Sequence, residues 1–186
     1  MRVDQVAVIP LATVGIAMST YVAQNRGAGQ WWRIRYGVFR ASVLAVLLAF
    51  GLGAMITIFG TDLVRLFVGE GEDRVVAMAH QYLMLNGSLY GVLAVLFLLR
   101  NALQGLGVTA VPTIAGFMEL FARSAVGLLL IDHIGFLGVC LAAPLAWVGA
   151  LVPVAIAWFI HRRRLLHAEA CAESLVERDG LELSTR

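Results

Sequence analysis

Residues 108–131 read VTAVPTIAGFMELFARSAVGLLLI, which is apolar almost throughout, yet Glu119 and Arg123 lie near the middle of the stretch. In a membrane-spanning helix each of these charges costs about 2.5–3.5 kcal/mol near the centre of the bilayer. The spacing of four residues places the two side chains on one helical face, with the acid in the favourable position before the base. Such a pair does not face lipid, so the stretch predicts other helices around it.

The Glu119/Arg123 pair has two interpretations. In the first, it is a buried ion pair that only orients its helix. In the second, Glu119 takes part in cation- or proton-coupled transport and Arg123 is its partner, since ionisable residues inside spans often mark ion pathways.

The composition extends the membrane interpretation to the whole chain. Hydrophobic residues make up 60% of the 186 residues and charged residues only 14%, which is too little polar surface for a soluble domain. We therefore predict an all-α, polytopic bundle within residues 1–164, followed by a polar tail at residues 165–186. Segments of about 20 apolar residues are needed to span a bilayer. Five spans are predicted, at about residues 5–25, 38–61, 76–100, 108–131 and 134–161.

Several functional classes are not expected. The net charge of +2 is too small to suggest nucleic-acid binding. Cys140 lies in an apolar run and Cys171 in the polar tail, so no disulfide is predicted. No cysteine and histidine spacing indicates a metal site or another bound cofactor. Without a nucleophile or metal constellation, an intramembrane enzyme is not expected either.

The loop charges predict an orientation. Arginine-containing segments follow the first, third and fifth spans, whereas the loops after the second and fourth spans are acidic or short. The positive-inside rule puts the first group in the cytoplasm. The expected location is the plasma or inner membrane, with several passes and a cytoplasmic C-terminus.

Three stretches, taken in order, resemble the multidrug and toxic compound extrusion (MATE) family. The first is a small-residue helix end with the signature Gln-Asn-x-Gly-Ala-Gly, formed by residues 24–29. The second is the turn at residues 100–107, and the third is Glu-Leu-x-x-Arg at residues 119–123. The motif residues outside this last pair are Gln24, Asn25, Gly27, Gly29, Asn101, Gln104, Gly105, Gly107 and Pro112.

The resemblance implies helices 8–12 of a twelve-helix protein whose two lobes form a V-shaped cavity. It implies export of organic, often cationic, compounds in exchange for H⁺ or Na⁺. The expected partners are membrane lipid, a small organic substrate, and a missing N-terminal lobe from the same longer chain or a separate one. Some family members carry an acid midway along helix ten, but residues 88–99 contain none. Glu119 is thus the only acid expected well inside a span.

Other polar residues have a functional and a structural interpretation. Asn86, Ser88 and Tyr90 are candidates for the lining of a substrate cavity, or else they form hydrogen bonds between helices. Gln24, Asn25, Asn101 and Gln104 are interpreted as capping or turn-forming residues rather than substrate contacts.

Two alternatives to ion-coupled efflux stay open at this point. The chain is either a truncated, non-transporting fragment with only an assembly role, or a flippase for a lipid-linked sugar from the same superfamily. A groove rich in arginine favours the flippase, yet only Arg123 is clearly placed inside a span by the sequence.

Overall fold

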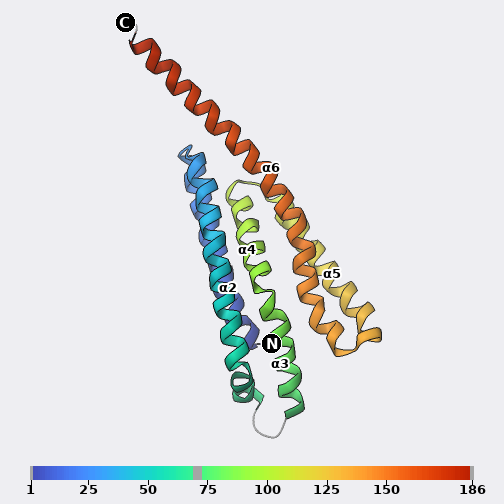
Figure 1. Cartoon of the computed structure of the whole chain (residues 1–186). Coiled ribbons are helices and arrows are strands. Elements are labelled where there is room, and N and C mark those ends of the chain that lie inside the picture. Colours follow the sequence, from blue (N-terminus) through green and yellow to red (C-terminus); the bar gives the residue numbers. More distant parts are fainter. Residues whose placement is uncertain (1, 69–72, 185–186) are drawn as a thin grey trace.

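The computed structural model describes residues 2–68 and 73–184, and helices account for nearly all of them (Figure 1). The predicted all-α class is confirmed. Six helices follow one another without strands in this described part: α1 (Arg2–Gly27), α2 (Trp31–Val68), α3 (Asp73–Ser88), α4 (Tyr90–Gly105), α5 (Ala110–Ile134) and α6 (Phe136–Ser184).

Helices α1 and α4 approach each other closely because small residues line their contact. A Cβ atom placed on Gly105 of α4 lies 2.5 Å from the carbonyl oxygen of Ser19 and 2.9 Å from Cβ of Val22, both on α1. A Cβ atom on Gly15 of α1 lies 2.8 Å from Nδ2 of Asn101. Small residues permit such close packing of membrane helices, where dispersion forces replace much of the hydrophobic driving force.

This contact gives a stability prediction. We expect Gly105→Ala to destabilise the protein by about 1–3 kcal/mol, because the added methyl group meets the α1 backbone rather than a movable side-chain tip. Gly91→Ala on the same helix is the matched control, since its Cβ has no neighbour within 4 Å. Thermal unfolding of the two variants in detergent micelles measures the difference. Equal midpoints for both would contradict the close packing of α1 against α4.

The third predicted span is not one straight helix. The structure breaks it between Ser88 and Tyr90, and the two halves, α3 and α4, meet at an angle of 52°. Leu89 leaves the helical conformation with φ −108° and ψ 8°. The hydroxyl of Ser88 donates a hydrogen bond to the carbonyl oxygen of Leu85 at 2.8 Å, which offers that carbonyl a partner outside the regular helical ladder. The segment predicted as a span at residues 76–100 therefore consists of two helices.

Helices α5 and α6 form an antiparallel hairpin, in which α6 packs on α2, α3 and α4 while α5 makes only a few contacts with α4. The loop expected at Asp132 and His133 belongs to the last turn of α5 instead. The turn is made at Gly135, whose φ of 60° is readily available only to glycine. Helix α6 then continues for 49 residues, so the tail at residues 165–184 prolongs the last span as one helix.

The outer surface of the bundle is that of a membrane protein. Three helices are long and apolar enough to cross a bilayer, and the bent α3–α4 pair makes a fourth candidate span among the residues described. Helix α5 is also apolar on average, with Glu119 and Arg123 near its middle. Only 28% of the apolar segments of α1 and α2 is buried inside the bundle. The remaining apolar side chains, such as Phe39 and Phe121, are exposed to lipid or to further protein.

One end of the bundle gathers arginines from segments far apart in the sequence. A guanidinium nitrogen of Arg26, near the end of α1, donates a hydrogen bond to the carbonyl oxygen of Leu106 in the α4–α5 turn. Arg35, near the start of α2, forms a 2.7 Å ion pair with Glu169 of α6. The turn between α1 and α2, the turn between α4 and α5, and the polar part of α6 therefore lie toward the same end of the bundle in Figure 1. We call this the arginine end, defined by Arg26, Arg33, Arg35, Arg40, Arg162, Arg163 and Arg164.

Candidate functional site

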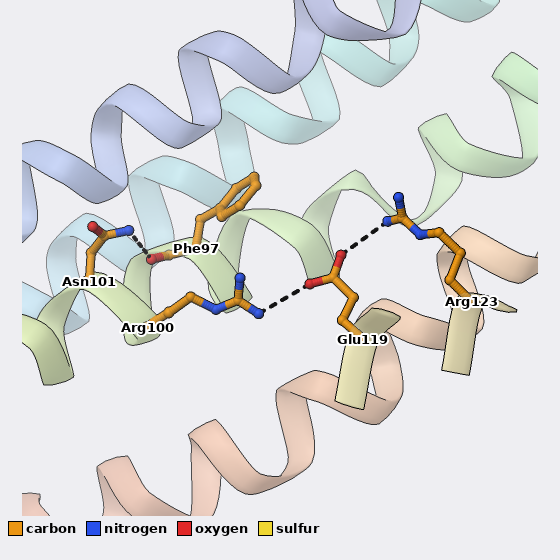
Figure 2. Close-up of polar contacts among 5 residues, drawn as sticks. All are labelled: Phe97, Arg100, Asn101, Glu119 and Arg123. Atoms are coloured by element: carbon orange, nitrogen blue, oxygen red, sulfur yellow. Dashed lines mark hydrogen bonds and ion pairs between the residues drawn. The ribbon is translucent and has the colours of Figure 1, made fainter. Parts of the chain in front are cut away.

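Glu119 lies near the middle of α5 and accepts hydrogen bonds from two arginines (Figure 2). Arg123, one turn further along α5, donates to Oε1 over 3.0 Å. Arg100, on α4, donates to Oε2 over 3.1 Å. The first contact follows from helical spacing, whereas the second joins two helices. We call these three residues the Glu119 cluster.

The Glu119 cluster is held together by charge-assisted hydrogen bonds. Each carboxylate oxygen has its own guanidinium donor, and charge-assisted hydrogen bonds of this kind are strong. The side chains of Arg100 and Glu119 are 18% and 21% exposed, against 49% for Arg123. The interhelical pair is thus better shielded from solvent than the pair within α5. With two guanidinium groups around one carboxylate, the cluster has one net positive charge.

Arg100 is the residue that the sequence analysis missed. We expected it only as the end of the third span and as part of a turn motif. Its Nε is buried and has no hydrogen-bond partner in the described part of the chain, so its position is not set by a full complement of contacts. The sequence could have indicated the Arg100–Glu119 pair, because ionisable residues inside membrane spans usually pair with one another. Arg100 precedes the turn that joins its helix to the helix bearing Glu119.

The three predicted cavity residues do not share one environment. Asn86 and Tyr90, on either side of the α3–α4 bend, are both fully buried. The ring of Tyr90 packs against Trp147 of α6, with centroids 6.4 Å apart and an interplanar angle of 42°. Ser88 is exposed and bonds only to its own helix, through Leu85. The structure therefore brings Asn86 and Tyr90 into the bundle interior and leaves Ser88 at its surface.

Asn86 carries an unusual polar atom. Its Nδ2 donates to the carbonyl oxygen of Tyr82 over 2.9 Å, but its Oδ1 is buried without a hydrogen-bond partner among the residues described. An unpaired buried acceptor costs about 1–3 kcal/mol, and such groups are retained chiefly where they have a function. Asn86 is consequently the stronger of the two interior candidates for a ligand contact.

A substitution at Asn86 separates stability from function. We expect Asn86→Leu to keep the stability of the wild type or to raise it by about 1 kcal/mol, because it removes the unpaired buried acceptor. If Asn86 contacts substrate, the same variant loses transport. Ser88→Ala is the control for stability, which it is expected to leave unchanged. Loss of stability in Asn86→Leu would show that the amide has a structural role.

The turn residues of the two loop motifs lie at the arginine end. Asn25 donates from Nδ2 to the carbonyl oxygen of Tyr21 over 2.8 Å, and α1 ends at Gly27. Gly29 follows with φ 68°. The side chain of Asn101 donates from Nδ2 to the carbonyl oxygen of Phe97, also over 2.8 Å (Figure 2). These contacts are local ones within each helix.

The turn between α4 and α5 is held by a hydrogen bond within its own backbone and by a side chain of α1. The N–H of Gly107 donates to the carbonyl oxygen of Gln104 over 2.8 Å, and Gly107 has φ 75°. A Cβ atom on Gly107 would lie 2.6 Å from a guanidinium nitrogen of Arg26, so glycine also makes room for that side chain. Pro112 lies in the first turn of α5, where its missing N–H costs no hydrogen bond.

Within the described residues, no three histidine, cysteine, aspartate or glutamate side chains are grouped closely enough to hold a metal ion. The interaction that the structure shows at the Glu119 cluster is ion pairing between one carboxylate and two guanidinium groups. Together with the fold, this defines a polytopic helical membrane protein with a paired carboxylate between two of its helices.

The family profile described as MatE matches residues 1–129, and the chain belongs to this family, the multidrug and toxic compound extrusion (MATE) transporters. Its members are transporters rather than enzymes. The matched region includes the Glu119 cluster and the turn motifs but ends within α5.

Two curated proteins are distantly similar to this chain. The probable multidrug resistance protein NorM of Thermotoga maritima is 22% identical over 157 residues, which are 83% of this chain and 32% of that protein. The probable multidrug resistance protein YpnP of Bacillus subtilis is 31% identical over 106 residues, or 57% of this chain and 23% of that protein. The similar regions thus span between about a quarter and a third of these relatives. No solved structure is significantly similar.

Proposed function

We propose that this chain is part of a secondary transporter that exports organic, often cationic, compounds in exchange for protons or sodium ions. Its membership of the MatE family supports this function, as do the names of its relatives as probable multidrug resistance proteins. The observation that carries the proposal is Glu119, an acid well inside a predicted span that is held by arginines of two helices. Such intramembrane carboxylates commonly bind the coupling ion.

Glu119 is the proposed coupling residue, and Arg100 and Arg123 are its partners. A proton on Glu119 removes the negative charge and leaves two guanidinium groups without a counter-ion. Their repulsion then separates α4 from α5, which are otherwise only lightly packed. Protonation of Glu119 would therefore loosen α5 from α4, while α6 keeps its contacts with α2, α3 and α4. Rocking of one part against another around a midplane site is the usual basis of alternating access.

The geometry favours a proton over a sodium ion. A proton and Na⁺ each add one positive charge to the Glu119 cluster, so the difference between them lies in the room and ligands that each needs. Both oxygens of Glu119 are already bound to guanidinium donors, so a metal cation would first have to displace one of them.

Asn86 and Tyr90 are the proposed interior contacts for substrate. Both lie beside the α3–α4 bend, and broken helices are where transporters commonly place their binding sites. The aromatic ring of Tyr90 suits an organic cation, which is attracted to the face of such rings. Ser88, exposed on this part of the protein, is proposed to face the cavity from its rim.

We further propose that five spans, including α5 and the bent α3–α4 pair, correspond to helices 8–12 of a two-lobed transporter. The arginine end is then cytoplasmic, in agreement with the positive-inside rule, and the membrane is the plasma or inner membrane. A C-terminal tag at the natural locus tests the two-lobe proposal by blotting of membranes. A band at more than twice 20.1 kDa is expected. A band near 20 kDa would require the other lobe to be a separate chain.

Export itself is tested in cells that lack their own efflux pumps and express the natural protein. We expect lower accumulation of a cationic dye, and a rise in accumulation when the proton gradient is collapsed. Unchanged accumulation despite verified membrane expression would contradict the proposal and favour a non-transporting fragment. The flippase alternative is less well supported, because both arginines of the Glu119 cluster are engaged by a carboxylate rather than free for a lipid phosphate.

A further inference from the structure

A groove of about 350 Å³ opens between α2, α4 and α6 and is separate from the Glu119 cluster. Its polar wall contains Arg35 and Ser42 of α2 and Arg162 of α6. Its apolar wall includes Leu99 of α4 and Trp158 and Phe159 of α6. The proposed transport site does not include Arg35 or Arg162, and no helix contact described above involves both of them.

The groove has a basic mouth and an apolar interior. Arg35 and Arg162 belong to the arginine end, where α2 begins and where the apolar part of α6 gives way to its polar extension. From there, Ser42 lies two turns deeper on α2, and Trp158 lies one turn deeper on α6. Phe159 is 57% exposed, so this side of the groove is open to the surrounding lipid.

Hydrogen-bonding capacity is left over at the mouth. In the described part of the chain, the guanidinium group of Arg162 has neither an ion pair nor a hydrogen bond. Arg35 donates from one terminal nitrogen to Glu169, but its Nε is buried and has no partner among the described residues. A guanidinium group can hold a carboxylate and a phosphate at once, because it has five donors in a fixed fork.

We propose that this groove binds an anionic phospholipid. The phosphate lies between the guanidinium groups of Arg162 and Arg35, and one acyl chain follows Leu99 and Phe159 toward the bilayer interior. Charge complementarity argues for this occupant, since basic pockets between membrane helices bind anionic headgroups. The apolar wall argues against a free phosphate ion, which would gain nothing from the interior of the groove.

Glu169 is the nearest opposing group, because its carboxylate shares Arg35 with the proposed phosphate. It therefore weakens lipid binding and links it to the polar part of α6. A bound phosphate that draws Arg35 inward also loosens the contact between α2 and that part of α6.

Trp158 makes the proposal measurable in the natural full-length protein. It lines the groove and is only 7% exposed, so an acyl chain in the groove lies close to its indole ring. The protein is reconstituted in phosphatidylcholine with increasing amounts of phosphatidylglycerol that carries brominated acyl chains. The fluorescence difference between wild type and Trp158→Phe then isolates quenching at this groove.

Arg162→Gln is expected to weaken this quenching about fivefold in apparent affinity, the effect of one arginine near an anionic surface. Glu169→Gln, which frees Arg35, is expected to strengthen it. Arg74→Gln, an exposed charge at the start of α3, is the matched control and is expected to change nothing.

Four outcomes would overturn the proposal. The first is equal quenching by brominated phosphatidylcholine and phosphatidylglycerol, and the second is equal affinity in Arg162→Gln and the wild type. The third is displacement by inorganic phosphate at millimolar concentration, which would indicate a small-anion site instead. Absence of any Trp158-dependent quenching, as when another protein segment covers the groove, also contradicts it. None of these results bears on transport.

Discussion

Replacing Glu119 with glutamine is expected to reduce ion-driven export to the background rate of membranes without the protein. The amide cannot exchange a proton, so the coupling step proposed for the Glu119 cluster is lost. The substitution also leaves Arg100, at 18% exposure, without its charged partner. We expect a loss of stability of about 1–3 kcal/mol from this second effect. Initial rates of dye export and thermal unfolding measure the two effects separately.

A loss of export in Glu119→Gln alone does not separate coupling from structural damage. The charge-free variant R100M/E119L/R123M provides the separation, because replacing an ion cluster by apolar residues of similar size is often neutral for stability. We expect this variant to fold as well as the wild type and to export nothing. Normal ion-driven export by the charge-free variant would show that the cluster only orients α5, which is the first interpretation given for Glu119 and Arg123.

Tyr90→Ala is expected to have the largest effect on stability, a loss of about 3–5 kcal/mol. The side chain is fully buried at the α3–α4 bend and packs against Trp147, so its removal leaves a cavity between α4 and α6. Thermal unfolding of the purified protein measures the loss. Ser88→Ala, two residues away and exposed, is the control, with an expected change near zero.

Tyr90→Phe tests the proposed substrate contact without opening the cavity. It keeps the aromatic ring, so cation binding to the ring face is expected to stay close to that of the wild type. Tyr90→Leu removes the aromatic ring but fills much of the space, and it should weaken transport of cationic dyes more than it lowers stability. Parallel decreases in transport and stability across the three variants would restrict Tyr90 to a packing role.

Much of this arrangement could be predicted from local sequence patterns. The all-α class follows from composition, and the contact between Glu119 and Arg123 follows from their spacing of four residues. The turn after α1 could be predicted from Gly27 and Gly29, which lie among polar residues. All of these are local properties of a helix or of a short turn.

The parts that could not be predicted depend on contacts between distant segments. The pairing of Arg100 with Glu119 requires α4 and α5 to pack in one particular rotation about their axes. The break at Leu89 follows Asn86, Gly87 and Ser88, which are poor helix formers but do not determine where the helix bends or by what angle. The burial of Asn86 and the exposure of Ser88 likewise depend on which face of α3 meets its neighbours.

Transport by the purified natural protein in proteoliposomes tests the central proposal most directly. Imposed proton and sodium gradients are compared for their ability to drive uptake of a cationic dye into liposomes that contain the protein in the inverted orientation. Our account predicts uptake driven by the proton gradient, weaker or no uptake with sodium, and none in Glu119→Gln. Dye movement that is independent of both gradients, or unchanged in Glu119→Gln, would contradict the account.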